Sequence, residues 1–124
     1  MADQSILVAN DEEDILRIIA DRLEFYGFQV RTARDGRACL DMIAEELPDL
    51  LLLDIRMPNM DGIQVLDRLK SECPDLPVIV VSASADHDLV EECLVRGATD
   101  YLIKPFEAVA LKEKVYGVLG KERS

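Results

Sequence analysis

Two short runs of the chain, Leu50–Leu53 and Val78–Val81, are apolar at every position. A strand with one face in water alternates apolar and polar residues, so these runs predict strands that are covered on both faces. Strands of this kind belong to parallel sheets with helices packed on each side. The rest of the chain must therefore supply helices for both faces of a sheet.

Strand-like and helix-like segments alternate five times along the 124 residues. The strands are expected at 5–9, 28–33, 50–53, 78–81 and 101–103, and apolar residues at helical spacing follow within 15–26, 38–43, 61–72, 89–94 and 108–119. The first helix has its apolar stripe at Ile15, Ile18, Ile19, Leu23 and Tyr26. Gly27 is expected to cap that helix at its C-terminus, and Asp61 to cap the third at its N-terminus. Right-handed crossovers then give one doubly wound α/β domain.

Charge and hydropathy exclude two classes of partner. The net charge is −11, and such a surface repels nucleic acid, so we expect no direct nucleic acid contact by this chain. Apolar runs such as Leu50–Leu53 are far too short to cross a bilayer, and Met1–Gln4 lacks the basic start of a secretory signal. We therefore expect no membrane partner and a cytoplasmic location.

Polar residues stand at the ends of four of the five predicted strands. Asn10 and Asp11 follow the first, Asp54 the third, Ser82 the fourth and Lys104 the fifth. In an open parallel sheet the carboxyl ends of the strands meet at one edge, where ligands bind. The topology therefore predicts that these side chains share a site.

These residue types suit phosphoryl transfer. Asp11 and Asp54 would repel each other unless a divalent cation neutralised them, and Mg²⁺ commonly uses one or two carboxylates together with waters and a phosphate. Carboxylates form aspartyl phosphates as covalent intermediates. Lys104 is suited to neutralising a phosphoryl oxygen and Ser82 to donating a hydrogen bond to another. Glu12, Glu13 and Asp14 are interpreted instead as acids of a first helical turn.

Four segments resemble the signature segments of the receiver domain of two-component response regulators, in the same order and spacing. They read ILVANDEED, LLLLDIRMPNMDG, VIVVSASAD and GATDYLIKPF. The resemblance spans almost the whole chain. It implies a single receiver domain over residues 1–124, with the possibility that this is the N-terminal receiver of a longer regulator. It also implies a flavodoxin-like, three-layer (βα)5 sandwich with strand order 2-1-3-4-5.

The resemblance assigns a role to each site residue. Asp54 would be the phosphoacceptor and a Mg²⁺ ligand, Asp11 a direct ligand, and the backbone carbonyl of Arg56 would complete the protein's share. Ser82 and Lys104 would contact the phosphoryl group.

Two further assignments concern the response to phosphorylation. Tyr101 matches the aromatic switch position, whose ring turns inward when the hydroxyl of Ser82 moves toward the phosphate. A half-buried aromatic without a switching role is the alternative interpretation of Tyr101. The Lys104–Pro105 bond is expected to be cis.

The sequence departs from the family pattern at Asn10, where an acidic residue is usual. That position typically reaches the metal through water, and an amide still accepts a hydrogen bond but brings no charge. We expect weaker Mg²⁺ binding rather than loss of function.

The resemblance implies a signalling switch in a phosphorelay. A sensor histidine kinase or a histidine phosphotransfer protein would supply the phosphoryl group. The face built by the fourth helix, fifth strand and fifth helix would then change shape for an output domain or protein. The chain would catalyse only its own phosphorylation and dephosphorylation, so it is not expected to be an enzyme in the ordinary sense.

Three other functions are weighed. A haloacid-dehalogenase-type phosphatase needs an acid two residues after its nucleophile, where this chain has Arg56. A flavodoxin-like FMN module needs a phosphate-binding first loop, but residues 10–14 are mostly acidic. A degenerate receiver that serves only as a binding platform is consistent with Asn10.

Overall fold

The computed structural model describes residues 4–57, 60–83, 87–104 and 107–119. Five strands alternate with five helices within these ranges, as the sequence predicts. No helix in the described part is long and apolar enough to cross a membrane. The elements are β1 (Ser5–Ala9), α1 (Glu13–Phe25), β2 (Gln29–Ala33), α2 (Gly36–Glu45), β3 (Leu50–Asp54), α3 (Gly62–Glu72), β4 (Val78–Ser82), α4 (His87–Val95), β5 (Asp100–Ile103) and α5 (Ala108–Leu119).

The strands form one parallel sheet in the order β2-β1-β3-β4-β5. This confirms the expected strand order and the flavodoxin-like α/β fold. The chain leaves β1 for β2 on one side and then returns to β3 on the other, so the direction of winding reverses between β1 and β3. Ligand sites of doubly wound sheets lie at this reversal, outside the carboxyl ends of the strands.

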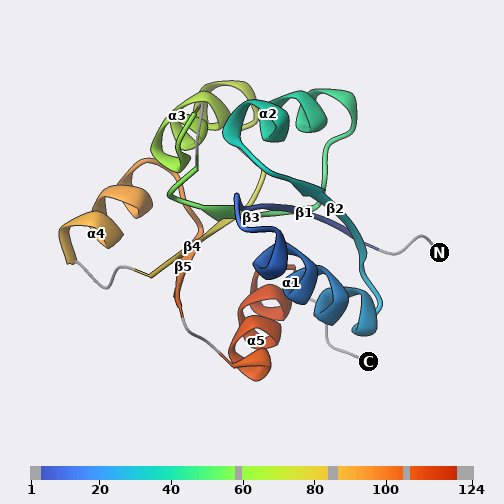
Figure 1. The fold of residues 1–124 in the computed structure, drawn as a ribbon. Coiled ribbons are helices and arrows are strands. Elements are labelled where there is room, and N and C mark those ends of the chain that lie inside the picture. The colour runs from blue at the N-terminus through green and yellow to red at the C-terminus, as the bar shows by residue number, and fades with distance from the viewer. Residues whose placement is uncertain (1–3, 58–59, 84–86, 105–106, 120–124) are drawn as a thin grey trace.

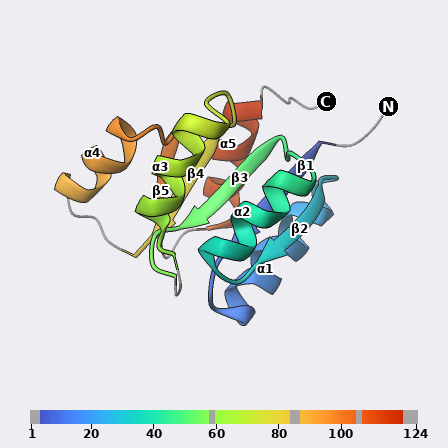
Figure 2. The ribbon, with the colours of Figure 1, turned by 90° about the horizontal axis from the view of Figure 1, so that it is seen from above.

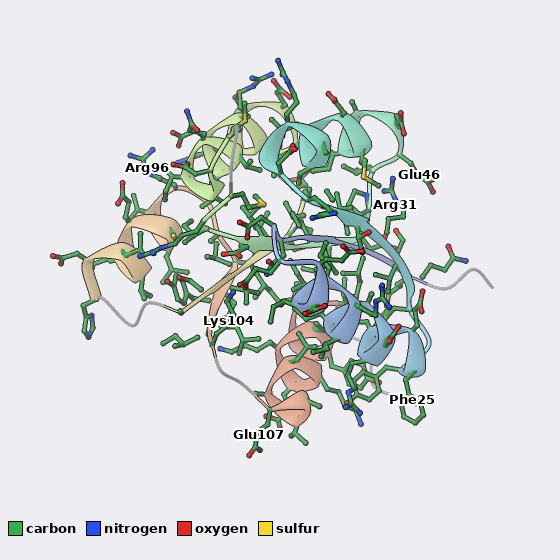
Figure 3. All side chains as sticks on the ribbon, viewed as in Figure 1. Phe25, Arg31, Glu46, Arg96, Lys104 and Glu107 are labelled. Atoms are coloured by element: carbon green, nitrogen blue, oxygen red, sulfur yellow. The ribbon has the colours of Figure 1, made fainter. Side chains whose placement is uncertain are left out.

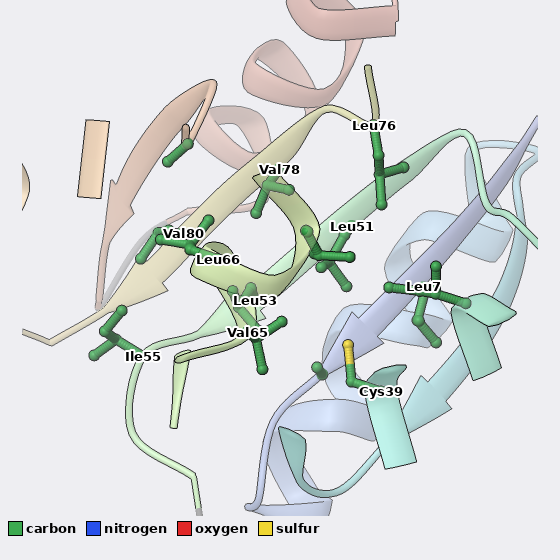
Figure 4. Close-up of a cluster of buried hydrophobic side chains, with 14 of the residues drawn as sticks. Leu7, Cys39, Leu51, Leu53, Ile55, Val65, Leu66, Leu76, Val78 and Val80 are labelled. Carbon is green, nitrogen blue, oxygen red and sulfur yellow. The ribbon is translucent and has the colours of Figure 1, made fainter. Parts of the chain in front are cut away.

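Helices cover both faces of the sheet, which gives three layers (Figures 1 and 2). Successive residues of the apolar strands point to opposite faces, so Leu51 and Leu53 belong to one hydrophobic cluster while Leu50 and Leu52 belong to another. The first cluster lies beneath α2, α3 and α4, and Figure 4 shows its centre. The second lies beneath α1 and α5. All five residues of β3 and of β4 are buried, as the unalternating runs predicted.

The buried stripe of α1 differs in part from the prediction. Leu16, Ile19 and Leu23 face the sheet, whereas Ile18 is 62% exposed. Residues spaced by three and four positions share a helix face, and the stripe that starts at Leu16 faces the sheet in this packing. The helix ends as predicted: Gly27 follows it with φ +100°, a conformation that glycine adopts without strain.

The start of α3 is fixed closely against the end of β3. Asp61 caps the helix as predicted, and with Gln64 it forms a capping box. The backbone N–H of Gly62 donates to the carbonyl of Ile55 at 2.9 Å. A Cβ at Gly62 would lie 2.7 Å from the Cα of Ile55 and 2.9 Å from the carbonyl oxygen of Asp54. Only glycine lets the helix approach the strand end this closely.

We therefore expect Gly62→Ala to destabilise the fold by roughly 1–3 kcal/mol, because the added methyl group meets backbone atoms that must move. Gly117→Ala is the matched control, because a Cβ there would have nothing within 4 Å. In the interior of α5 this exchange should stabilise by roughly 0.5–1 kcal/mol, since alanine favours the helix. Urea unfolding of both variants measures the difference. Equal effects of the two exchanges would contradict the close approach at Gly62.

Candidate functional site

A cleft of about 550 Å³ opens at the carboxyl ends of the strands. Four of its lining residues, Asp11, Asp54, Ser82 and Lys104, come from the ends of four different predicted strands. The structure therefore brings together most of the residues that the sequence placed at this edge. The described lining consists of Asp11, Glu12, Asp54, Arg56, Ser82, Ala83 and Lys104.

Asp54 lies at the centre of this arrangement. It is the last residue of β3 and is only 5% exposed, directly after four buried leucines. The backbone N–H of Arg56 donates to Oδ1 of Asp54 at 3.1 Å. The Nζ atom of Lys104 lies 3.5 Å from Oδ2. Each carboxylate oxygen thus has one positively polarised neighbour.

The Arg56 N–H and the Lys104 ammonium do not fully offset the cost of burying the Asp54 charge. Removal of the carboxyl from water raises the pKa of Asp54 above its ordinary value of 3.8, and the nearby Asp11 raises it further. The Arg56 N–H and the Lys104 ammonium lower it by less. The net direction is upward, so the charged form of Asp54 is under-compensated and would gain from an additional cation.

Hydrogen bonding between β4 and β5 positions the two other polar residues, Ser82 and Lys104. Ser82 is the last residue of β4 and is buried. The backbone N–H of Lys104 donates to the carbonyl of Ser82 at 2.7 Å, which extends the strand pairing by one step. This bond places the backbone of Lys104 beside Ser82. The Lys104 side chain, which is labelled in Figure 3, brings its Nζ atom to 3.5 Å from Oδ2 of Asp54.

Asn10 and Asp11, which both follow β1 and were expected at one site, differ in whether they line the cleft. Asp11 is exposed and lines the cleft. Asn10 is buried, and its Oδ1 accepts the backbone N–H of Glu12 at 2.9 Å, so among the described residues it is not part of the lining. Glu12 does line the cleft, which the interpretation as a first-turn helix acid missed. The sequence held no signal that separates Glu12 from Glu13, because the start of α1 at Glu13 is seen only in the structure.

The donors in this cleft fit a magnesium ion. Asp11, Glu12 and Asp54 share the cleft with the hydroxyl residue Ser82, and Mg²⁺ prefers oxygen ligands of these kinds. In the described ranges, no three side chains of histidine, cysteine, aspartate or glutamate form a metal cage. Mg²⁺ does not need one, because it usually keeps several waters.

Two other expected site residues have clear positions. Arg56 is exposed, lines the cleft and contributes its backbone N–H to Asp54. Tyr101 is 7% exposed and belongs to the cluster beneath α2, α3 and α4, so its ring is buried rather than half-buried. Pro105, for which a cis bond is expected, lies outside the described residues.

The burial of Asp54 predicts a pH-dependent gain in stability from Asp54→Asn. Because the folded-state pKa is raised, protonation favours the folded state, and this contribution is lost as pH rises through the raised pKa. Without metal at pH 7.5, the variant should therefore melt at a higher temperature than the unmodified chain. The difference should narrow as pH falls toward the ordinary value of 3.8.

Asp75→Asn is the matched control, since it removes the same charge from an exposed position. A variant at Asp54 that is no more stable than the Asp75 variant at neutral pH would contradict a costly buried charge.

The chain matches known proteins over nearly its full length. The response regulator receiver domain family matches residues 6–116. PrrA of Mycobacterium tuberculosis, a transcriptional regulatory protein, is 39% identical over 119 residues, which are 96% of this chain and 51% of that protein. The regulatory protein AtoC of Escherichia coli is 40% identical over 102 residues, which are 82% of this chain and 22% of AtoC. The chain thus spans about half or less of the length of these curated relatives.

Solved structures agree with the sequence matches. The receiver domain of NtrX from Brucella abortus superposes with a TM-score of 0.89 at 34% identity, and the match covers 94% of this chain and 99% of that one. A CheY-like receiver domain protein from Methanospirillum hungatei has a TM-score of 0.91 at 30% identity, covering 96% and 95%. With the family match, these likenesses establish that the chain belongs to the response regulator receiver domain family of two-component systems.

Proposed function

We propose that this chain is a phosphorylation-dependent signalling switch that accepts a phosphoryl group on Asp54 with the help of Mg²⁺. The observation that carries the proposal is the position of that carboxylate. It is 5% exposed at the end of β3, its pKa is raised, and it faces Lys104 in a cleft that other strand ends line. A carboxylate held at such a cost to stability indicates a functional group rather than a structural one.

The residues of the cleft suggest how transfer from a phosphohistidine would proceed. The Arg56 N–H holds Oδ1 of Asp54, so Oδ2 is the oxygen placed to attack phosphorus. As the new O–P bond forms, the P–N bond to the histidine breaks and the imidazole leaves. The Lys104 ammonium, already 3.5 Å from Oδ2, neutralises charge on the phosphoryl oxygens. Ser82, at the adjacent strand end, donates a hydrogen bond to another of them.

Asp11, Asp54 and the backbone carbonyl of Arg56 would hold the magnesium ion. When bound, Mg²⁺ would supply positive charge that lets two carboxylates and an incoming phosphoryl group share one cleft. Asp11 therefore serves chiefly to bind and orient. Because transfer ends with the phosphoryl group on the protein itself, the chain acts as a switch that catalyses only its own modification.

The response to phosphorylation would run from Ser82 and Tyr101 to the face formed by α4, β5 and α5. Tyr101 lies in β5 with its ring already in the core, so movement of the Ser82 segment would be coupled to this strand. That face carries exposed apolar side chains suited to a protein partner. They are Leu94, Val95, Ile103 and Val109.

The partners follow from this assignment. A sensor histidine kinase or a histidine phosphotransfer protein supplies the phosphoryl group, and an output domain or a separate protein receives the signal. The net charge of −11 argues against direct nucleic acid contact by this chain, and the kinase exchange is proposed to take place in the cytoplasm.

Intact-mass measurement after treatment with acetyl phosphate and Mg²⁺ tests the proposal. We expect the unmodified chain to gain one phosphoryl group, because Asp54 lies in a cleft that neutralises the incoming charge. Asp54→Asn should gain none. Asp75→Asn, which removes an exposed carboxylate, should be modified as fast as the unmodified chain.

Labelling of Asp54→Asn at the full rate would overturn the assignment of the phosphoacceptor. A chain that takes up no label at all, and that also fails to bind beryllofluoride with Mg²⁺, would instead be a degenerate receiver that acts as a binding platform.

A further inference from the structure

We propose that Glu12 supplies, through a bridging water, the second acidic charge near the magnesium ion that Asn10 does not provide. This inference rests on the proposed Mg²⁺ site. It concerns how that site, in this particular chain, retains its negative charge with an amide at position 10.

The side chain of Asn10 is hydrogen-bonded to the backbone of its own loop. Its side chain is 1% exposed, and its Oδ1 accepts the N–H of Glu12, two residues further along, at 2.9 Å. This is the hydrogen bond of an Asx-turn, which fixes the path of the chain. The amide therefore acts as a turn-forming group beneath the cleft. It brings no charge, and its oxygen is already paired.

The same turn presents Glu12 at the cleft. Glu12 lines the cavity together with Asp11 and Asp54. It occupies the N-cap position of α1, yet its side chain forms no capping hydrogen bond. Among the described residues, none of the ion pairs involves its carboxylate. Glu12 therefore lines the proposed cation site, and its side chain is not engaged in capping the helix.

The next residue along the chain provides a contrast. The carboxylate of Glu13 lies 3.8 Å from Arg17 and 3.6 Å from Arg34, so it is paired with surface cations. Glu13 is not among the described residues that line the cleft. The acidic run after β1 is therefore divided by the structure: Asp11 and Glu12 belong to the cleft, whereas Glu13 belongs to the surface.

An outer position suits Glu12 better than direct ligation. No three acidic, histidine or cysteine side chains of the described residues form a cage, so a third direct carboxylate is not provided. Mg²⁺ keeps several of its waters when bound to proteins, and those waters need acceptors. Outer partners of this kind typically change metal affinity by about 10- to 100-fold. One exposed carboxylate should be near the lower limit.

Calorimetric titration with Mg²⁺ alone, without a phosphoryl donor, tests the inference. We expect Glu12→Gln to weaken Mg²⁺ binding roughly tenfold, because an outer acceptor loses its charge. Glu13→Gln is the matched control and should change the affinity by less than about twofold, since its charge is already paired and lies outside the cleft. The double variant Asn10→Asp/Glu12→Gln, called the exchanged pair, moves the acidic charge from position 12 to position 10. The net charge of the chain stays the same. The exchanged pair should bind within about threefold of the unmodified chain.

Equal effects of Glu12→Gln and Glu13→Gln would overturn the inference while leaving the proposed function intact. An exchanged pair that binds no more tightly than Glu12→Gln alone would overturn it as well, because the charge would then not be what matters. Absence of measurable Mg²⁺ binding by the unmodified chain would instead remove the proposed magnesium site itself. Since both glutamates are exposed, the melting temperatures of Glu12→Gln and Glu13→Gln should match that of the unmodified chain.

Discussion

A carboxylate buried at the end of an apolar strand is the constraint on which the rest of this molecule depends. Asp54 follows Leu50–Leu53 in a strand with both faces covered, and it is only 5% exposed. A charge in that position is costly unless opposite charges and hydrogen bonds surround it. Lys104 and the Arg56 N–H offset only part of this cost, because the pKa of Asp54 remains raised. The incomplete compensation supports the proposed binding of a cation and, with it, a phosphoryl group in this cleft.

The fold provides the partners of Asp54 through its topology. Asp11 follows the first strand, Ser82 ends the fourth, and Lys104 follows the fifth, yet all three line one cleft with Asp54. Parallel strands bring their carboxyl ends to the same edge, and the reversal of winding between β1 and β3 leaves that edge open. Residues outside the cleft also help to hold the strand end that carries Asp54 in position. Gly62, for example, lets α3 approach the backbone that carries Asp54.

Pattern and topology were sufficient to predict the sheet and the edge where the polar residues meet. The unalternating runs predicted buried strands, and those strands supply alternate residues to the two clusters. What the pattern could not predict depends on geometry over one or two residues. A single hydrogen bond, from the backbone N–H of Glu12 to the side chain of Asn10, forms the turn that carries both residues. Similarly, the choice between Leu16 and Ile18 on the buried face of α1 depends on how the helix rotates against the sheet.

A ¹³C NMR titration of the Asp54 carboxyl carbon in the metal-free chain measures directly whether this buried charge is under-compensated. We expect an apparent pKa of Asp54 above the ordinary 3.8, because desolvation and the Asp11 charge outweigh Lys104 and the Arg56 N–H. Saturating Mg²⁺ should lower this pKa. A metal-free pKa at or below the ordinary value, unchanged by Mg²⁺, would contradict an under-compensated charge at Asp54. It would mean that the existing contacts already satisfy the buried charge.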